Sequence, residues 1–259
     1  MQVALFYDQL DGLEDGYLAK TSGDASKQIP RADFYWMNIF GDLEDLEQAF
    51  NLDGKYDNVT KLLGSGSCSA LIKLLPGNQD LYIAHDTWNS YQSMLRILKK
   101  YTFSYHWDDT KRSEHLVPGQ TMSFSSYPGL IYSGDDFYLI STGLAVTETT
   151  IGNGNKDLWK FVKPKGQLLE GVRTTIANRL AKNGKHWSKY FAKRNSGTYN
   201  NQWMVLDYNK FKPGKDLTNT KGLLWVLEQL PGDLLTILYY FSPHIEKYTY
   251  ISKTIKYQL

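Results

Sequence analysis

Two short apolar segments on either side of a four-residue turn constrain the fold of this chain more than any other feature. Residues 68–75 and 80–85 each have the length of a β-strand, and Pro76-Gly-Asn-Gln79 between them is a turn sequence. Together they predict a β-hairpin. A turn centred between Gly77 and Asn78 sets Cys68 opposite roughly residue 87. Cys68 begins the first strand and His85 ends the second, so both are expected at the same end of the hairpin.

A thiol beside an imidazole is a recurring nucleophile arrangement, because the thiolate is the reactive form and a neighbouring base favours it. Each residue also has a structural interpretation. A single cysteine at the start of a strand is commonly a small buried hydrophobe. A histidine such as His85 often serves only as a hydrogen-bonding group. Spacing alone therefore leaves the roles of Cys68 and His85 open.

The segment before the cysteine, Gly64-Ser-Gly-Ser67, consists of small residues whose backbone can adopt strained conformations. A Cys68 thiol could attack the preceding carbonyl there, move the acyl group to sulfur and let water cut the Ser67–Cys68 bond. The new α-amino group of Cys68, with a pKa near ~8, could then act as a base for its own side chain.

The remaining sequence predicts alternating groups of helices and strands. Residues 1–63 look partly helical, with Asp42 as the N-cap of a helix that carries Leu43, Leu46 and Phe50 on one face. Asp86 or Thr87 is expected to cap a second helix. Its predicted apolar face and basic C-terminal end comprise Trp88, Tyr91, Leu95, Leu98, Lys99 and Lys100.

Short strands are expected over 121–151, helices over 168–180 and 186–194, and further strands at 202–207 and 222–229. This order predicts a layered α+β sandwich built on antiparallel sheets. It lacks the regular alternation of a Rossmann or barrel fold.

Composition narrows the function classes. The net charge of +2 gives no reason to expect a nucleic acid partner. The single cysteine excludes an intrachain disulfide, and the scattered histidines show no metal-ligand spacing, so we expect no metal and no cofactor. No apolar run is long enough for a transmembrane helix, and the N-terminus does not resemble a signal peptide. Asn58-Val-Thr60 is a sequon for N-glycosylation.

Beyond these patterns, the chain closely resembles the phospholipase B-like (lamina ancestor) family from about residue 3 to about Gly232, and most of all its lysosomal, second-type members. The matching segments are long and occur in order. They are Gly64–Gly77, Ala84–Tyr91, Phe124–Gly129, Ser133–Tyr138, Glu148–Asn153 and Asn195–Trp203.

The resemblance implies an αββα sandwich of the N-terminal-nucleophile hydrolase type, with self-cleavage between Ser67 and Cys68. It also implies hydrolysis of acyl ester bonds of lipids, or of the amide bond of an N-acyl substrate, in the lysosome or the extracellular space. Cys68 and His85 match the motif positions of the family. Further residues are expected to hold the oxyanion or line the site: Asn200, Asn201, Asn195, Thr149, Thr150 and Trp88. The asparagines could instead form a turn, and Trp88 could belong to the core.

Members of this family are longer than this chain, so we expect the sandwich to be incomplete at its C-terminus. The expected division is an N-terminal segment over 1–67, a partial hydrolase core over 68–232 and a divergent tail over 233–259. Two other functions stay open, a non-catalytic lysosomal or secreted binding protein and an inactive truncated product. The sequence does not predict the oligomeric state.

Overall fold

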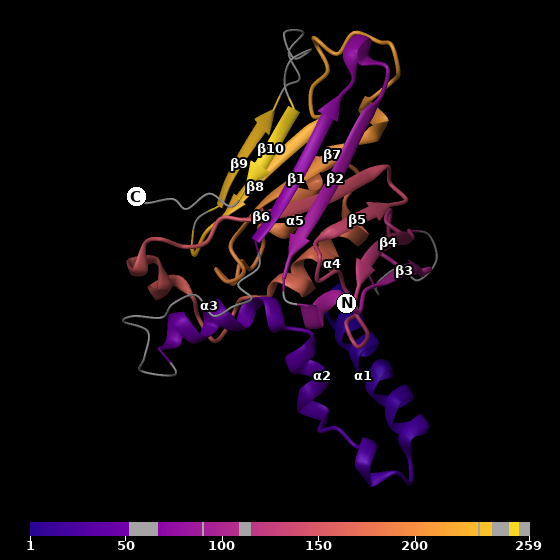
Figure 1. The fold of residues 1–259 in the computed structure, drawn as a ribbon, viewed down its shortest axis with the longest axis vertical. Helices are drawn as coiled ribbons and strands as arrows, with labels where there is room; N and C mark the ends of the chain where they lie inside the picture. The colour runs from indigo at the N-terminus through magenta and orange to yellow at the C-terminus, as the bar shows by residue number, and fades with distance from the viewer. Residues whose placement is uncertain (52–66, 90, 109–114, 233, 240–248, 254–259) are drawn as a thin grey trace.

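The structure, a computed structural model, describes residues 1–51, 67–89, 91–108, 115–232, 234–239 and 249–253 (Figure 1). The helices are α1 Gln2–Thr21, α2 Arg31–Met37, α3 Phe40–Phe50, α4 Glu170–Leu180 and α5 Gly184–Phe191. The first seven strands are β1 Ser67–Leu74, β2 Leu81–Trp88, β3 Ile97–Thr102, β4 Thr121–Ser126, β5 Phe137–Ile140, β6 Leu144–Thr150 and β7 Asn201–Asp207. The last three are β8 Leu224–Gln229, β9 Leu234–Tyr239 and β10 Thr249–Lys253.

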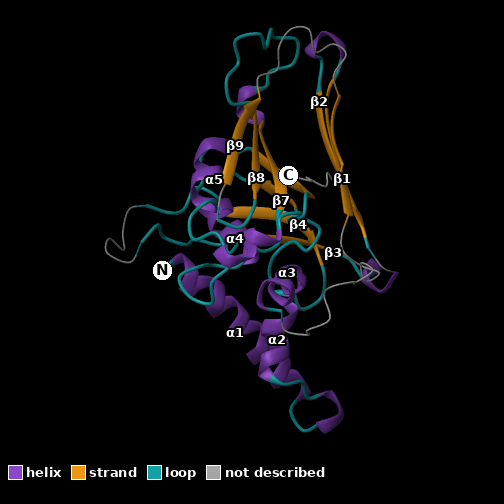
Figure 2. Cartoon of the chain, turned by 90° about the vertical axis from the view of Figure 1, so that its left-hand side faces the viewer, coloured by secondary structure: helices purple, strands orange, loops and turns teal. Residues whose placement is uncertain are grey.

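The strands form two antiparallel sheets, which face one another in Figure 2. The smaller sheet has the order β10-β1-β2, and the larger has the order β3-β4-β5-β6-β7-β8-β9. Between the sheets lies an apolar cluster that includes Ile72 of β1 with Met204 and Leu206 of β7. On the opposite face of the larger sheet, Trp187 and Phe191 of α5 pack against that sheet. The described residues therefore form three layers, with helices on one side of two facing sheets.

The mixed α+β architecture with antiparallel sheets is confirmed. A four-layer αββα sandwich also needs helices over the outer face of the smaller sheet. In the described part of the chain no α-helix covers that face (Figure 2), and Tyr82 of β2 is 52% exposed. The complete sandwich stays a prediction.

The hairpin and its register are confirmed. β1 and β2 pair along their whole length, with Cys68 opposite Thr87 and His85 opposite Ala70. Pro76–Asn78 forms a 3₁₀ turn between the two strands. Residues alternate between buried and exposed along both strands, as expected for a sheet with one face against a core. This alternation places Cys68 and Ala70 on the buried face.

The predicted helix after His85 is wrong. β2 continues to Trp88, a 3₁₀ turn follows at Tyr91–Met94, and β3 begins at Ile97. Thr87 pairs with Cys68, so its backbone belongs to the sheet and cannot cap a helix. The apolar residues also lack a core to face, because Tyr91 is 89% and Leu98 90% exposed.

The predicted N-cap role of Asp42 is also wrong. α3 begins at Phe40, and Asp42 lies within its first turn. Its buried carboxylate instead accepts a hydrogen bond from the backbone N–H of Glu170, at 3.1 Å, and another from the hydroxyl of Thr198. Asp42 therefore stabilises the first turn of a distant helix, α4, where a negative charge is favourable.

The other predicted elements are present. The strands expected over 121–151 are β4, β5 and β6, the two later helices are α4 and α5, and the last two strands are β7 and β8. The tail after Gly232 adds one edge strand to each sheet, since β9 pairs with β8 and β10 pairs with β1. None of the described helices combines the length and the apolar character needed to cross a bilayer.

Candidate active site

Cys68 and His85 lie together at one end of the hairpin. Their positions follow from the register. Cys68 pairs with Thr87, and His85 lies two residues before Thr87 on the same strand. Such diagonal pairs share one face of a sheet. Cys68 is a free thiol with 5% of its surface exposed. The His85 side chain is 3% exposed. Both groups point into the space between the two sheets.

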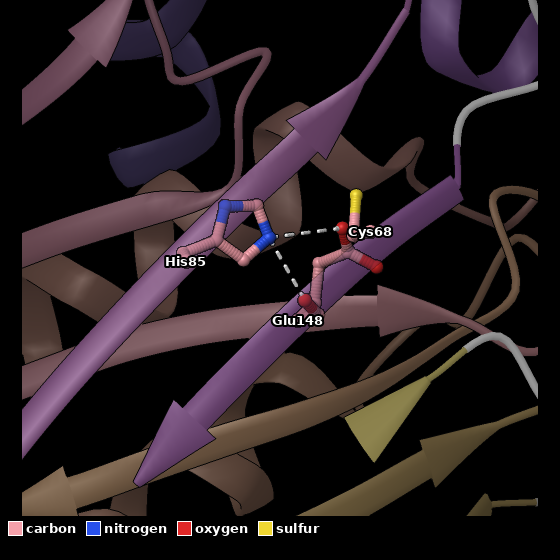
Figure 3. Close-up of side chains that lie close together, drawn as sticks. All are labelled: Cys68, His85 and Glu148. Carbon is pink, nitrogen blue, oxygen red and sulfur yellow. Dashed lines mark hydrogen bonds and ion pairs between the residues drawn. The ribbon is translucent and has the colours of Figure 1, made fainter. Parts of the chain in front are cut away.

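Glu148 of β6 completes the cluster from the larger sheet (Figure 3). The sulfur of Cys68, a ring nitrogen of His85 and a carboxylate oxygen of Glu148 all lie within 4.8 Å of one another. The Nε2 atom of His85 is 3.0 Å from the backbone oxygen of Glu148 and 4.0 Å from its Oε1. The Glu148 side chain is completely buried. A thiol, an imidazole and a carboxyl group therefore meet in a buried site.

Sequence reasoning missed Glu148, because it is far from Cys68 along the chain and comes from another sheet. A signal was available. Glu148 is the one charged residue of the strand sequence Leu144–Thr150, and an acid that such a strand buries is rare unless it is paired or functional.

The hydrogen bonds of the imidazole define its proton position. A carbonyl oxygen only accepts, so Nε2 of His85 carries the hydrogen that it donates to Glu148. Nδ1 then carries the lone pair, and it faces the Thr87 hydroxyl at 3.4 Å. Burial lowers the pKa of His85, which keeps the ring neutral.

Two further acidic residues, Asp135 and Asp136, come from the loop 133–136. Asp136 is buried and accepts a hydrogen bond from the phenol of Tyr199. Burial, followed by the charge of Glu148, raises the pKa of Asp136 well above its usual range. Burial also raises the pKa of Glu148, to about 8. The carboxyl groups of Asp136 and Glu148 therefore hold their protons more tightly than exposed acids do.

The same surroundings keep the thiol protonated. Burial, and then the negative charges of Glu148 and Asp136, raise the pKa of Cys68 far above the ordinary thiol value. Cys68 is therefore a protonated thiol, and its attack on a carbonyl would need a group that removes its proton.

The three predicted asparagines have different surroundings. Asn195 donates to the backbone oxygen of Leu230, and its own oxygen accepts from Gly197. Asn200 donates from Nδ2 to Asp45 and to the carbonyl of Gly197. The amide nitrogen and oxygen of Asn201 are buried without a hydrogen-bond partner among the described residues. Asn201 is therefore the asparagine of this group with an amide left for a ligand.

The remaining predicted residues lie on two strands. Thr149 and Thr150 are at the end of β6, opposite Gln202 and Asn201 of β7. Trp88 ends β2 opposite Ser67, so it is beside the predicted cleavage site rather than on a helix. Its ring nitrogen donates to Asp86 at 3.0 Å, and it is 54% exposed. Asn58, the predicted glycosylation site, lies outside the described residues.

A cavity of about 240 Å³ adjoins this end of the hairpin, with Thr87 in its wall. Thr87 links the cavity to the cluster, because it pairs with Cys68 and faces His85. The other described lining residues are Asn89, Ser93, Met94 and Arg96. The guanidinium of Arg96 is held 3.4 Å from the Asp135 carboxylate.

Thiolate, imidazole and carboxylate are also the ligand types that zinc prefers in proteins. In the described part of the chain, Cys68, His85 and Glu148 form the one group that brings such ligands together. The Nε2 hydrogen of His85 already bonds the Glu148 carbonyl, so a metal would have to displace it. The expectation of no metal stays a prediction.

Comparison with known proteins gives a consistent match over most of the chain. The family model described as Phospholipase B matches residues 1–255. Phospholipase B-like 2 of Homo sapiens is 51% identical over 235 residues, which cover 89% of this chain and 38% of the human protein. Phospholipase B-like 2 of Caenorhabditis elegans is 42% identical over 252 residues, covering 94% of this chain and 40% of that protein.

A third relative gives the same result. Phospholipase B-like protein B of Dictyostelium discoideum is 42% identical over 239 residues, covering 90% of this chain and 40% of the relative. The chain thus spans about two fifths of the length of these curated relatives. The family match extends past Gly232 into the tail that carries β9 and β10.

Proposed function

The chain belongs to the phospholipase B family, and from that premise we propose that it carries the nucleophile of an acyl hydrolase. In this proposal the Ser67–Cys68 bond is cut by the chain itself, and Cys68 becomes a new N-terminal residue. The free enzyme then hydrolyses acyl ester bonds of lipids, or the amide bond of an N-acyl substrate.

One observation carries the proposal. The chain's single cysteine lies at the start of β1, buried, with His85 and Glu148 within 4.8 Å. An inert core cysteine needs apolar neighbours only, whereas this one shares its site with two ionisable side chains.

The raised pKa of the Cys68 thiol supports activation by cleavage. Negative neighbours keep the thiol protonated while its nitrogen is part of a peptide bond. Cutting that bond creates an α-amino group on the same residue, with an ordinary pKa near ~8. The neutral amine accepts the thiol proton, and the thiolate attacks the substrate carbonyl carbon. The C–O or C–N bond of the substrate then breaks, the α-ammonium group gives its proton to the departing alcohol or amine, and the acyl group remains on sulfur as a thioester. Water then hydrolyses the thioester and regenerates the thiol.

The substrate side of the site includes Asn201 and the cavity. The buried, unpartnered amide of Asn201 is the favoured oxyanion donor of the asparagine group, since Asn200 already donates to Asp45. The cavity beside Thr87 combines the apolar Met94 with the cationic Arg96. We place the enzyme in the lysosome or the extracellular space.

The test is cleavage of the purified chain. Mass spectrometry of the wild-type protein, incubated between about pH 5 and about pH 8, should detect a fragment that begins at Cys68. Cys68→Ala should stay intact, and Cys68→Ser should be cut more slowly because an alcohol is a weaker nucleophile than a thiol.

An intact wild-type chain under all these conditions would remove the mechanism. If the chain is cut but releases no acyl product from phospholipids or N-acyl amides, the non-catalytic binding protein becomes the better interpretation. A wild-type chain that is neither cut nor folded would instead favour the interpretation as an inactive truncated product.

A further inference from the structure

The self-cleavage step has a requirement that the mature enzyme does not share. Before the cut, the nitrogen of Cys68 belongs to a peptide bond, so it has no free amine to accept the thiol proton. Another group must remove that proton if the thiol is to attack the Ser67 carbonyl. The question rests on the proposed function, and the described cluster offers two candidates, His85 and Glu148.

His85 is poorly oriented for this task. Its Nε2 atom faces Glu148 and carries a hydrogen, which it donates to the Glu148 carbonyl at 3.0 Å. Its lone pair is on Nδ1, which faces Thr87 at 3.4 Å. The imidazole therefore presents a donor to the cluster and holds its acceptor on the side of Thr87.

The Glu148 carboxyl has the opposite character. Both of its oxygens are buried, and interactions with the Cys68 thiol and with Asp136 lower its pKa, against the effect of burial. A carboxylate oxygen within 4.8 Å of the thiol sulfur is placed to accept its proton. We propose that the carboxylate of Glu148 accepts the Cys68 thiol proton during self-cleavage.

The step transfers the acyl group of Ser67 from the nitrogen of Cys68 to its sulfur. The Cys68 S–H bond breaks, its proton moves to Glu148, and the thiolate forms a bond with the Ser67 carbonyl carbon. The carbon–nitrogen bond then breaks, and Glu148 returns the proton to the leaving nitrogen, which becomes the α-amine of Cys68. Water hydrolyses the resulting thioester to the Ser67 carboxylate and a free thiol.

The surroundings of Glu148 suit a proton that is taken up and then returned. Glu170 of α4 raises the pKa of Glu148 by its charge, whereas interactions with Cys68 and with Asp136 of the loop 133–136 lower it, and His85 faces the same carboxyl group from the smaller sheet. Burial raises the pKa of Glu148 to about 8. A carboxylate with this pKa is a stronger base than an exposed one, so it removes a proton from the Cys68 thiol, whose own pKa is raised, more readily than an ordinary glutamate would.

The test compares variants of the whole chain in the presence of EDTA. Glu148→Gln preserves shape but removes the proton acceptor, and we expect it to slow the appearance of the Cys68 fragment by about 100-fold or more. Glu148→Asp keeps a carboxylate and should retain part of the rate. Glu228→Gln is the matched control, since Glu228 is a buried strand glutamate in β8. It should cleave like the wild type.

The pH profile separates a proton acceptor from a merely structural residue. The wild-type cleavage rate should rise as Glu148 ionises, between about pH 6 and about pH 8. If Glu148→Gln does not fold, this profile and the Glu148→Asp rate carry the test. Cleavage of folded Glu148→Gln at the wild-type rate, or a wild-type rate that falls over this range, would overturn the inference while leaving Cys68 as nucleophile. A wild-type chain that never cleaves would instead overturn the proposed function.

Discussion

Asp42 is one of the residues that join the N-terminal helices to the remainder of the fold. Its buried carboxylate accepts from the backbone of Glu170 and from Thr198, which belong to two other segments. Asp42→Ala leaves both donors buried and unpaired. We expect it to lower the free energy of unfolding by about 2 kcal/mol at neutral pH, as measured by urea denaturation.

The control is an aspartate on the surface of the protein. Asp15 is exposed on α1, and Asp15→Ala should change the free energy of unfolding by about 0.5 kcal/mol or less. Equal effects of the two substitutions would show that the hydrogen bonds of Asp42 do not stabilise the fold.

At the scale of single residues, the sequence predicts what depends on local pairing. Cys68 and His85 could be placed together because one short turn determines the register of their two strands. Glu148 and Asp136 could not, since they reach the site through the packing of one sheet on another and the course of a loop. Asp42 was misassigned because capping rules consider the nearest helix, and its partner is α4.

Among the elements, the loop before β7 depends on one glycine. Gly197 has a φ of +72°, and a Cβ there would lie 2.8 Å from the backbone Cα of Pro231. Its carbonyl also accepts from Asn200, so the loop has little freedom to move. We expect Gly197→Ala to destabilise the protein by about 3 kcal/mol, from the left-handed backbone and the overpacking together.

Gly214 gives a matched comparison. Its φ is +71°, but a Cβ there would meet nothing within 4 Å. Gly214→Ala should therefore cost only the backbone term, about 1 kcal/mol. Thermal unfolding of the two variants measures the difference, and a similar loss in both would mean that the contact with Pro231 relaxes without cost.

The elements that the sequence predicts well are those with turns or core faces of their own. The segment after His85 fails for a physical reason. The helical spacing of Trp88, Tyr91, Leu95 and Leu98 suggests an apolar face, but these side chains are more than half exposed. Apolar periodicity indicates a helix only where a core exists to receive it.

For the whole molecule, local patterns predict two kinds of layer but not their assembly. Nothing in the sequence places β6 in the middle of the larger sheet or pairs β10 with β1. These contacts join distant segments, so they depend on the packing of both sheets around Ile72 and Met204 rather than on any short motif.

That packing also buries several acids, which makes stability depend on pH. Burial raises the pKa of Asp42 to about 6, that of Asp45 to about 7 and that of Glu148 to about 8. The unfolded chain loses these protons near pH 4, so above that value the folded state holds more protons. Stability is then lost as pH rises through the folded values. The lowered pKa of His85 has the opposite effect on stability, but the combined effect of Asp42, Asp45 and Glu148 is larger.

We therefore expect the melting temperature to fall by about 5 °C or more between about pH 5 and about pH 8. Asp45→Asn tests the cause. The amide oxygen of asparagine can still accept from the Tyr199 N–H and from Asn200, while the titrating group is gone. The variant should lose less stability than the wild type over this range, because each proton contributes about 1.4 kcal/mol per pH unit. A melting temperature that rises with pH, or an unchanged slope in Asp45→Asn, would show that the buried acids do not determine the pH dependence.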